Sequence, residues 1–155
     1  MIVCEGKTDL GFLKHLRRTY CSGRDDAPEM DFKQSYGKGG NQVVDVLLRV
    51  VKYKAYDVRV ALTEADAPPT QASLKDLVRN KGRHVVVSPC IEGLLLGILG
   101  HPVPPLSSEC KDRLAAIEAR DLSDPITYER HWPRGRLDVA RPGNLVLGQL
   151  IALFE

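Results

Sequence analysis

The 155-residue sequence lacks a marked excess of charge of either sign, and it has no long apolar run. Its 22 lysines and arginines nearly balance its 20 aspartates and glutamates, which leaves a formal net charge of +2. This balance excludes a histone-like polycation and an acidic solvating protein, but not a nucleic-acid partner, because a neutral sum can hide local patches. The longest apolar stretch, 91–99, carries Glu92 and is about half of the roughly 20 residues needed to span a bilayer. We therefore expect no membrane partner.

Closely spaced cysteine pairs are missing as well. Cys4, Cys21, Cys90 and Cys110 stand singly, without the C-x-x-C pair typical of zinc sites. Charged residues already occur at positions 5 and 7, so we expect no signal peptide and a cytoplasmic protein. Free, mostly buried thiols are the expected state in such a chain, although the spacing leaves a disulfide open.

The order of segments predicts the class of fold. Short β-type segments occur at 1–4, 30–35, 56–63 and 83–88. Helices are expected from Thr8 or Asp9, after 41, over 70–80, 91–99, 107–120 and 145–154, with an irregular stretch at 122–141. This alternation predicts a single α/β domain with a mainly parallel sheet of about four strands and helices on both faces. The carboxyl ends of such strands share one edge, where open α/β sheets bind ligands.

Four carboxylates follow the predicted strands: Glu5 the first, Glu64 and Asp66 the third, and Glu92 the fourth. In extended backbone, Glu64 and Asp66 at i and i+2 would point the same way. Clustered carboxylates repel unless a cation lies among them, and Mg²⁺ and Mn²⁺ take oxygen ligands. The pattern predicts a metal site for phosphoryl transfer. The alternative is that each acid, like Asp9, favours a helix N-terminus.

The same residues resemble motifs of Toprim domains. The stretch 2–9, Ile-Val-Cys-Glu-Gly-Lys-Thr-Asp, is similar to the first Toprim motif, an apolar strand followed by Glu-Gly and a polar triplet that opens a helix. Glu64-Ala65-Asp66 is similar to the second motif, Asp-x-Asp, with glutamate in place of the first aspartate. The order resembles the RloB-like branch still more closely, through the Gly-rich step at 37–41, the strand led by Tyr56-Asp57, and the Ser-Pro element at 88–92 that ends in a glutamate. This resemblance covers about residues 1–100.

The resemblance implies one Toprim-like domain over 1–155 and nuclease chemistry that depends on Mg²⁺ or Mn²⁺. It also implies that Glu5 is a general acid or base and that Glu64, Asp66 and Glu92 hold the metal. Lys7 beside Glu5 would contact the scissile phosphate, or it is a solvated lysine. The competing hypothesis, favoured by the glutamate at position 64 and by the small size, is a non-catalytic module that binds nucleic acid or a partner protein. A receiver-like domain ranks last, since it would need a phosphorylatable aspartate where Glu64 stands.

Two further segments are candidates for binding nucleic acid. The glycine-rich segment 37–41 could contact a phosphate through backbone N–H groups, or it is a flexible turn. The stretch 128–136 interleaves aromatic residues with arginines, which can hold phosphates and stack on unpaired bases. Its alternative is a surface loop anchored by Trp132. The expected nucleic-acid-binding residues are Lys38, Arg130, Arg134 and Arg136.

The remaining candidates for catalysis are weaker. The four histidines lack metal-ligand spacing, and His15 and His84 are interpreted as surface positions. No Gly-x-Ser-x-Gly elbow supports a serine nucleophile. Cys90 is interpreted as a small buried packing residue rather than as a nucleophile.

Overall fold

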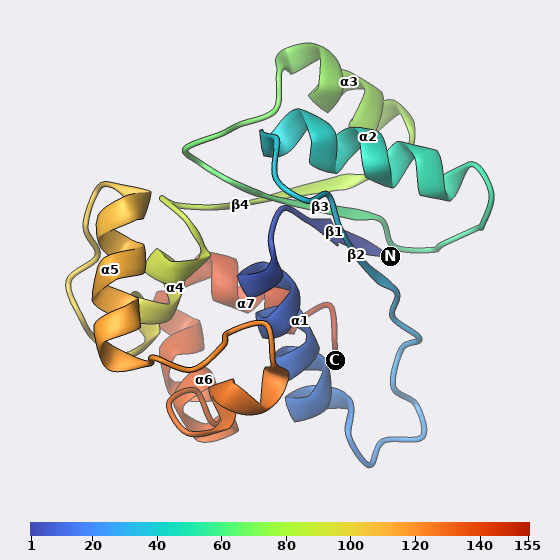
Figure 1. Ribbon diagram of the computed structural model, residues 1–155. Helices are drawn as coiled ribbons and strands as arrows, with labels where there is room; N and C mark the ends of the chain where they lie inside the picture. Colours follow the sequence, from blue (N-terminus) through green and yellow to red (C-terminus); the bar gives the residue numbers. More distant parts are fainter.

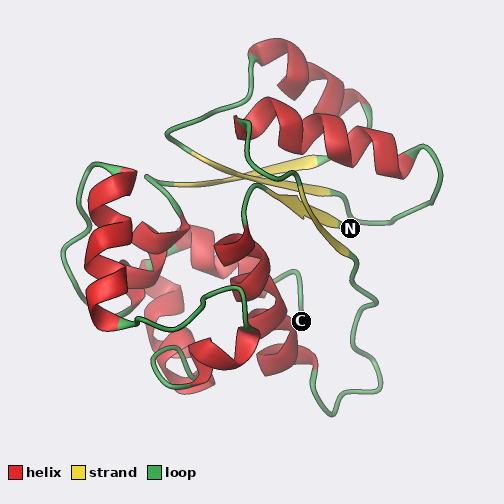
Figure 2. Ribbon diagram, viewed as in Figure 1, coloured by secondary structure: helices red, strands yellow, loops and turns green.

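The computed structural model describes residues 1–155 and contains one four-stranded sheet in which all strands are parallel (Figures 1 and 2). Its strands, in spatial order, are β2 (Phe32–Gln34), β1 (Ile2–Cys4), β3 (Val60–Glu64) and β4 (Arg83–Val87). The helices are α1 (Lys7–Cys21), α2 (Gly39–Val51), α3 (Gln71–Arg79), α4 (Ile91–Ile98), α5 (Ser107–Ile117), α6 (Arg134–Ala140) and α7 (Leu145–Ile151). The expected α/β class with a parallel sheet of four strands is confirmed.

Helices cover both faces of the sheet, as expected. Figure 1 shows α2 and α3 on one face and α1 with α4 to α7 on the other. Each face of the sheet has its own hydrophobic core, and the short strand β1 contributes side chains to both. Ile2 and Cys4 belong to the larger core, and Val3 belongs to the smaller core under α2 and α3. Strands buried on both faces are typical of parallel sheets. The carboxyl ends of the four strands therefore meet at one edge between two helical layers.

Local hydrogen bonds explain where several helices begin. The Thr70 hydroxyl accepts the Ser73 N–H at the start of α3, and the Asn144 side chain accepts the Leu147 N–H at the start of α7. Helix α1 begins at Lys7, earlier than the expected cap at Thr8 or Asp9. The reason is that the Asp9 carboxylate accepts the Gly6 N–H at 2.9 Å, and this bond lets the helix start directly after Gly6.

The C-terminal third is more regular than expected. The stretch 122–141, predicted to be irregular, contains two short helical segments, the 3₁₀ helix Pro125–Glu129 and α6. Both are too short to show a helical period in the sequence. The first buries Tyr128, the second buries Leu137, and the buried Trp132 lies between them. The Trp132 indole N–H donates to the Leu95 carbonyl of α4 at 3.1 Å. Trp132 thus anchors this segment, as expected if the stretch 128–136 is a segment that packs on the protein through Trp132.

Other element boundaries also differ from expectation. Strand β3 begins at Val60, not at 56, because Val60 pairs with Ile2, the first residue of β1. Helix α5 ends at Ile117, before the expected 120, because Glu118 adopts an extended conformation and its carboxylate accepts the Arg120 N–H. Helix α7 ends at Ile151, before the expected 154, and the chain then turns so that Phe154 packs into the core.

The histidine and cysteine predictions have mixed outcomes. The prediction that His15 lies on the surface is wrong: it is 2% exposed, and its Nε2 lies 2.8 Å from the Trp132 carbonyl oxygen. All four cysteines are free, and three of them are buried, as expected. None of the helices is both long enough and apolar enough to cross a membrane.

Candidate metal centre

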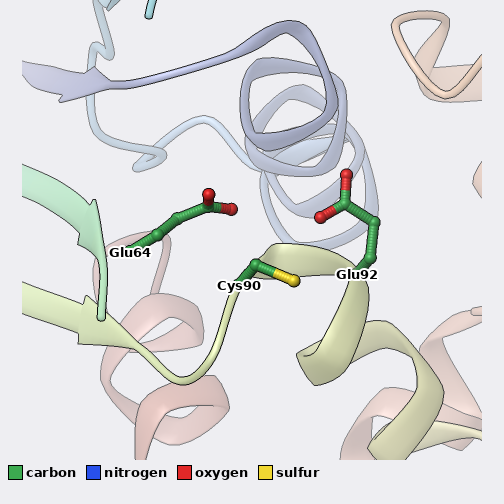
Figure 3. A group of neighbouring side chains, drawn as sticks. All are labelled: Glu64, Cys90 and Glu92. Carbon is green, nitrogen blue, oxygen red and sulfur yellow. The ribbon is translucent and has the colours of Figure 1, made fainter. Parts of the chain in front are cut away.

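Glu64, Cys90 and Glu92 meet at the carboxyl edge of the sheet. Glu64 is the last residue of β3, and it pairs with Val87 at the end of β4. The chain leaving β4 therefore passes Glu64 at once, and the Ile91 N–H that opens α4 donates to Glu64 Oε1 at 2.9 Å. The carboxylate oxygens of Glu64 and Glu92 and the sulfur of Cys90 all lie within 4.8 Å of one another (Figure 3). This group could hold a metal ion.

The two glutamates are buried with too few partners. Glu64 is 8% exposed and Glu92 is 7% exposed. Glu92 Oε2 is buried and has no hydrogen-bond partner, and none of the salt bridges of the protein includes either residue. Burying a charged carboxylate without a compensating partner is unfavourable by several kcal/mol. The pair is therefore a place where a cation would be strongly stabilised.

Asp9 adds a third buried carboxylate that sequence reasoning treated only as a helix cap. It is 3% exposed, and its Oδ1 has no partner although Oδ2 accepts the Gly6 N–H. Burial, followed by the charge of Glu64, raises the pKa of Asp9 to about 8. Burial and the charges of Glu92 and Asp66 raise the pKa of Glu64 to about 7. The sequence signal for Asp9 was its place in the polar triplet after Glu5, in the first turn of a helix that starts at the same edge.

The thiol and one lysine complete the surroundings of the carboxylates. Burial raises the pKa of the Cys90 thiol to about 12, although the Gly93 N–H opposes the rise, so the free site holds a neutral thiol. Lys111 is an exposed residue of α5. Partial burial lowers its pKa, but the charges of Glu92 and Glu64 outweigh this effect, so the net pKa lies above the ordinary value. Lys111 is thus the nearby cation that the sequence analysis missed, because no motif marks it.

Glu5 and Asp66 lie at the same edge but outside the group of three. Glu5 Oε1 accepts the Gly39 N–H at 3.2 Å, while its Oε2 is buried without a partner. The glycine-rich step therefore holds Glu5 in place. Asp66 is exposed and accepts a hydrogen bond from the Ser107 hydroxyl. The expectation that Glu64 and Asp66 share an extended segment is wrong, because β3 ends at Glu64 and the chain turns through Asp66.

The predicted cations are spread over the molecule. Lys7 is exposed at the start of α1, and Lys38 is exposed in a left-handed conformation at the start of α2, so both lie near the acidic edge. Arg134 stacks over Tyr20, 5.2 Å from the ring centroid. Positions 9 and 20 of α1 are separated by about 16 Å of helix, which puts Arg134 toward the opposite end of α1.

Arg130 and Arg136 belong to the same C-terminal segment. Both are exposed, and the Arg136 guanidinium donates to the His131 carbonyl at 2.9 Å. Arg136 lines an open cavity together with Gly97 and Gly100, at the end of α4 that lies away from Glu92. Their binding of nucleic acid stays a prediction.

Comparison of the chain with protein-family models, with curated proteins and with solved structures found no match. The Toprim resemblance therefore depends on the sequence motifs alone. The site depends on its own geometry: the buried Glu64, Glu92 and Cys90 lie together at the carboxyl edge of the sheet, and the charges of Glu64 and Glu92 act on the buried Asp9.

Proposed function

We propose that this protein hydrolyses phosphodiester bonds of nucleic acid in a metal-dependent reaction, as a Toprim-type nuclease. One observation carries the proposal. The buried carboxylates of Asp9, Glu64 and Glu92 gather at the carboxyl edge of the sheet, and oxygens of Asp9 and Glu92 have no partner. A purely structural role would leave these oxygens unsatisfied, whereas a divalent cation would satisfy them.

The donor set suits a divalent ion. Carboxylate oxygens are the preferred ligands of Mg²⁺ and Mn²⁺, and these ions usually keep several positions for water and for substrate phosphates. Glu64 and Glu92 would hold the ion. Asp66, in the turn that directly follows β3, is close enough to raise the pKa of Glu64. When bound, such an ion would supply an activated water and neutralise charge that develops on the phosphate.

The protein's own residues have separate roles in this proposal. Glu5 is held through Oε1 by the Gly39 N–H, so its free Oε2 is positioned to take or give a proton. Lys7, at the N-terminus of α1, and Lys111, on α5, would attract the phosphates of the substrate to the acidic edge.

The proposal is tested with purified protein, Mg²⁺ or Mn²⁺, and end-labelled single- and double-stranded RNA and DNA. We expect cleavage that a chelator abolishes, and a loss of at least about 100-fold in rate in Glu92→Gln. Glu29→Gln is the matched control, since Glu29 is exposed in the loop before β2, at the other edge of the sheet.

Two results would overturn the nuclease proposal. Equal cleavage by Glu92→Gln, Glu29→Gln and the wild type would show that the activity does not depend on this site. Binding of the labelled nucleic acids without cleavage, under every divalent ion tested, would leave the non-catalytic binding module as the function.

A further inference from the structure

Cys90 contributes a sulfur atom to a site otherwise made of carboxylates. It is fully buried directly before α4, and its sulfur lies within 4.8 Å of carboxylate oxygens of both Glu64 and Glu92. Figure 3 shows the Cys90 side chain between the side chains of Glu64 and Glu92. A sulfur so close to two buried carboxylates is not a simple packing contact, because an apolar neighbour would make their burial still more unfavourable.

A second observation indicates that this place receives a cation. Glu92 is only 7% exposed, and its Oε2 is buried without a partner in the protein. Lys111, whose pKa the charge of Glu92 raises, forms no salt bridge with it. A cation bound at the Glu92 carboxylate would compensate this buried oxygen.

We propose that Glu64, Cys90 and Glu92 form a mixed oxygen and sulfur site for a thiophilic divalent transition ion of the Zn²⁺ and Co²⁺ class, with the Cys90 sulfur as a direct ligand. Thiolates select such ions, whereas Mg²⁺ takes oxygen ligands almost exclusively. Binding through the sulfur releases the thiol proton to solvent. The proposal shares the metal site of the proposed function but not its reaction, so it holds whether or not nucleic acid is cleaved.

The dimensions of the group agree with this assignment. Zinc–sulfur and zinc–oxygen bonds of about 2.3 and 2.1 Å give a ligand separation of about 3.6 Å in a tetrahedral site. The ligand atoms, at most 4.8 Å apart, would need to close by roughly 1 Å, which side-chain torsions of two glutamates can provide. Three protein ligands leave a fourth position open, as in catalytic rather than structural zinc sites.

Titration with Co²⁺ tests the sulfur ligand directly, because cobalt bound to a thiolate shows a sulfur-to-metal charge-transfer band in the near ultraviolet. We expect the wild type to develop this band with one ion per chain. Cys90→Ser should lose the band. Its Zn²⁺ affinity should fall by about 100-fold or more, because loss of a mere hydrogen-bond partner of a metal ligand already lowers affinity by about 10- to 100-fold. Cys110→Ser is the matched control, since Cys110 is also buried, lies beside Cys90 and faces the Pro104 carbonyl; it should keep the band.

A band that persists in Cys90→Ser, or that is absent from the wild type, overturns the proposal. Cadmium NMR of the wild type gives a check that needs no substitution, because one sulfur ligand moves the cadmium resonance far from that of an all-oxygen site. An all-oxygen resonance would also overturn it. Mg²⁺-dependent cleavage without the cobalt band would refute only the sulfur ligand, whereas the band without cleavage under any ion would refute only the nuclease.

Discussion

Replacing Glu64 with glutamine should stabilise the metal-free protein at mildly alkaline pH, although most substitutions of buried residues destabilise. Glutamine keeps a side-chain oxygen that can accept the Ile91 N–H, so the start of α4 is preserved. It removes the negative charge that lies near Glu92 and Asp9. The variant therefore separates the effect of the charge from that of side-chain packing.

The expected size follows from the pKa of Glu64. Burial, together with the charges of Glu92 and Asp66, raises this pKa from 4.5 to about 7. At about 1.4 kcal/mol per pH unit the difference corresponds to about 3 kcal/mol, which solvent screening reduces to about 2 kcal/mol. Because the folded state has the higher pKa, the protein loses this free energy as the pH rises between 4.5 and about 7, and the penalty is absent below that interval.

The assay is urea unfolding in the presence of a chelator, at pH 8 and again near pH 4. We expect Glu64→Gln to exceed the wild type by about 2 kcal/mol at pH 8 and to match it near pH 4. Glu29→Gln, which removes an exposed charge, should show no such pH-dependent difference. Addition of a divalent ion should stabilise the wild type more than Glu64→Gln. A variant less stable than the wild type at pH 8, or a difference that does not change with pH, would refute the reasoning.

Two further predictions concern packing and the ion pair between the buried Glu118 and the exposed Arg120. Gly11→Ala should lower the free energy of unfolding by about 3 kcal/mol, because a Cβ there would lie 2.1 Å from the Leu122 carbonyl oxygen. Gly135→Ala has open space around it and should raise the free energy of unfolding by about 0.5–1 kcal/mol. Thermal unfolding of both variants checks this. The Arg120 guanidinium lowers the pKa of Glu118 to about 2, so Glu118→Gln should cost about 1 kcal/mol at pH 7. The loss should shrink as the pH falls toward 2, where about half of the wild-type carboxyl is already neutral, and equal losses at both pH values would contradict the assignment.

The two central strands, β1 and β3, could be predicted from the sequence because each is an apolar run that leads to an acid, Glu5 or Glu64. Val60 to Leu62 are fully buried, as a strand covered on both faces requires, and Glu64 follows at the edge. Glu92 could be predicted as a site residue for the same reason, since it lies shortly after a strand. These features depend on neighbours along the chain, which the sequence displays directly.

The rest of the site depends on contacts between distant segments, which the sequence does not display. Asp9 has the sequence context of a helix cap, and only the approach of β3 and α4 reveals it as a third buried carboxylate. A lone cysteine such as Cys90 is interpreted from the sequence as a packing residue. Only the fold shows that the turn after β4 places its sulfur beside Glu64. Lys111 comes from α5, beyond the stretch in which the motifs occur.

The buried indole of Trp132 makes the molecule its own optical probe. It is the only tryptophan of the chain, and it is bonded to the Leu95 carbonyl, one helical turn beyond Glu92 on α4. Indole emission responds to small changes in local polarity and geometry. Any shift of α4 that follows occupancy of the acidic edge should therefore change the intrinsic fluorescence from a single, known position, without a dye or a label.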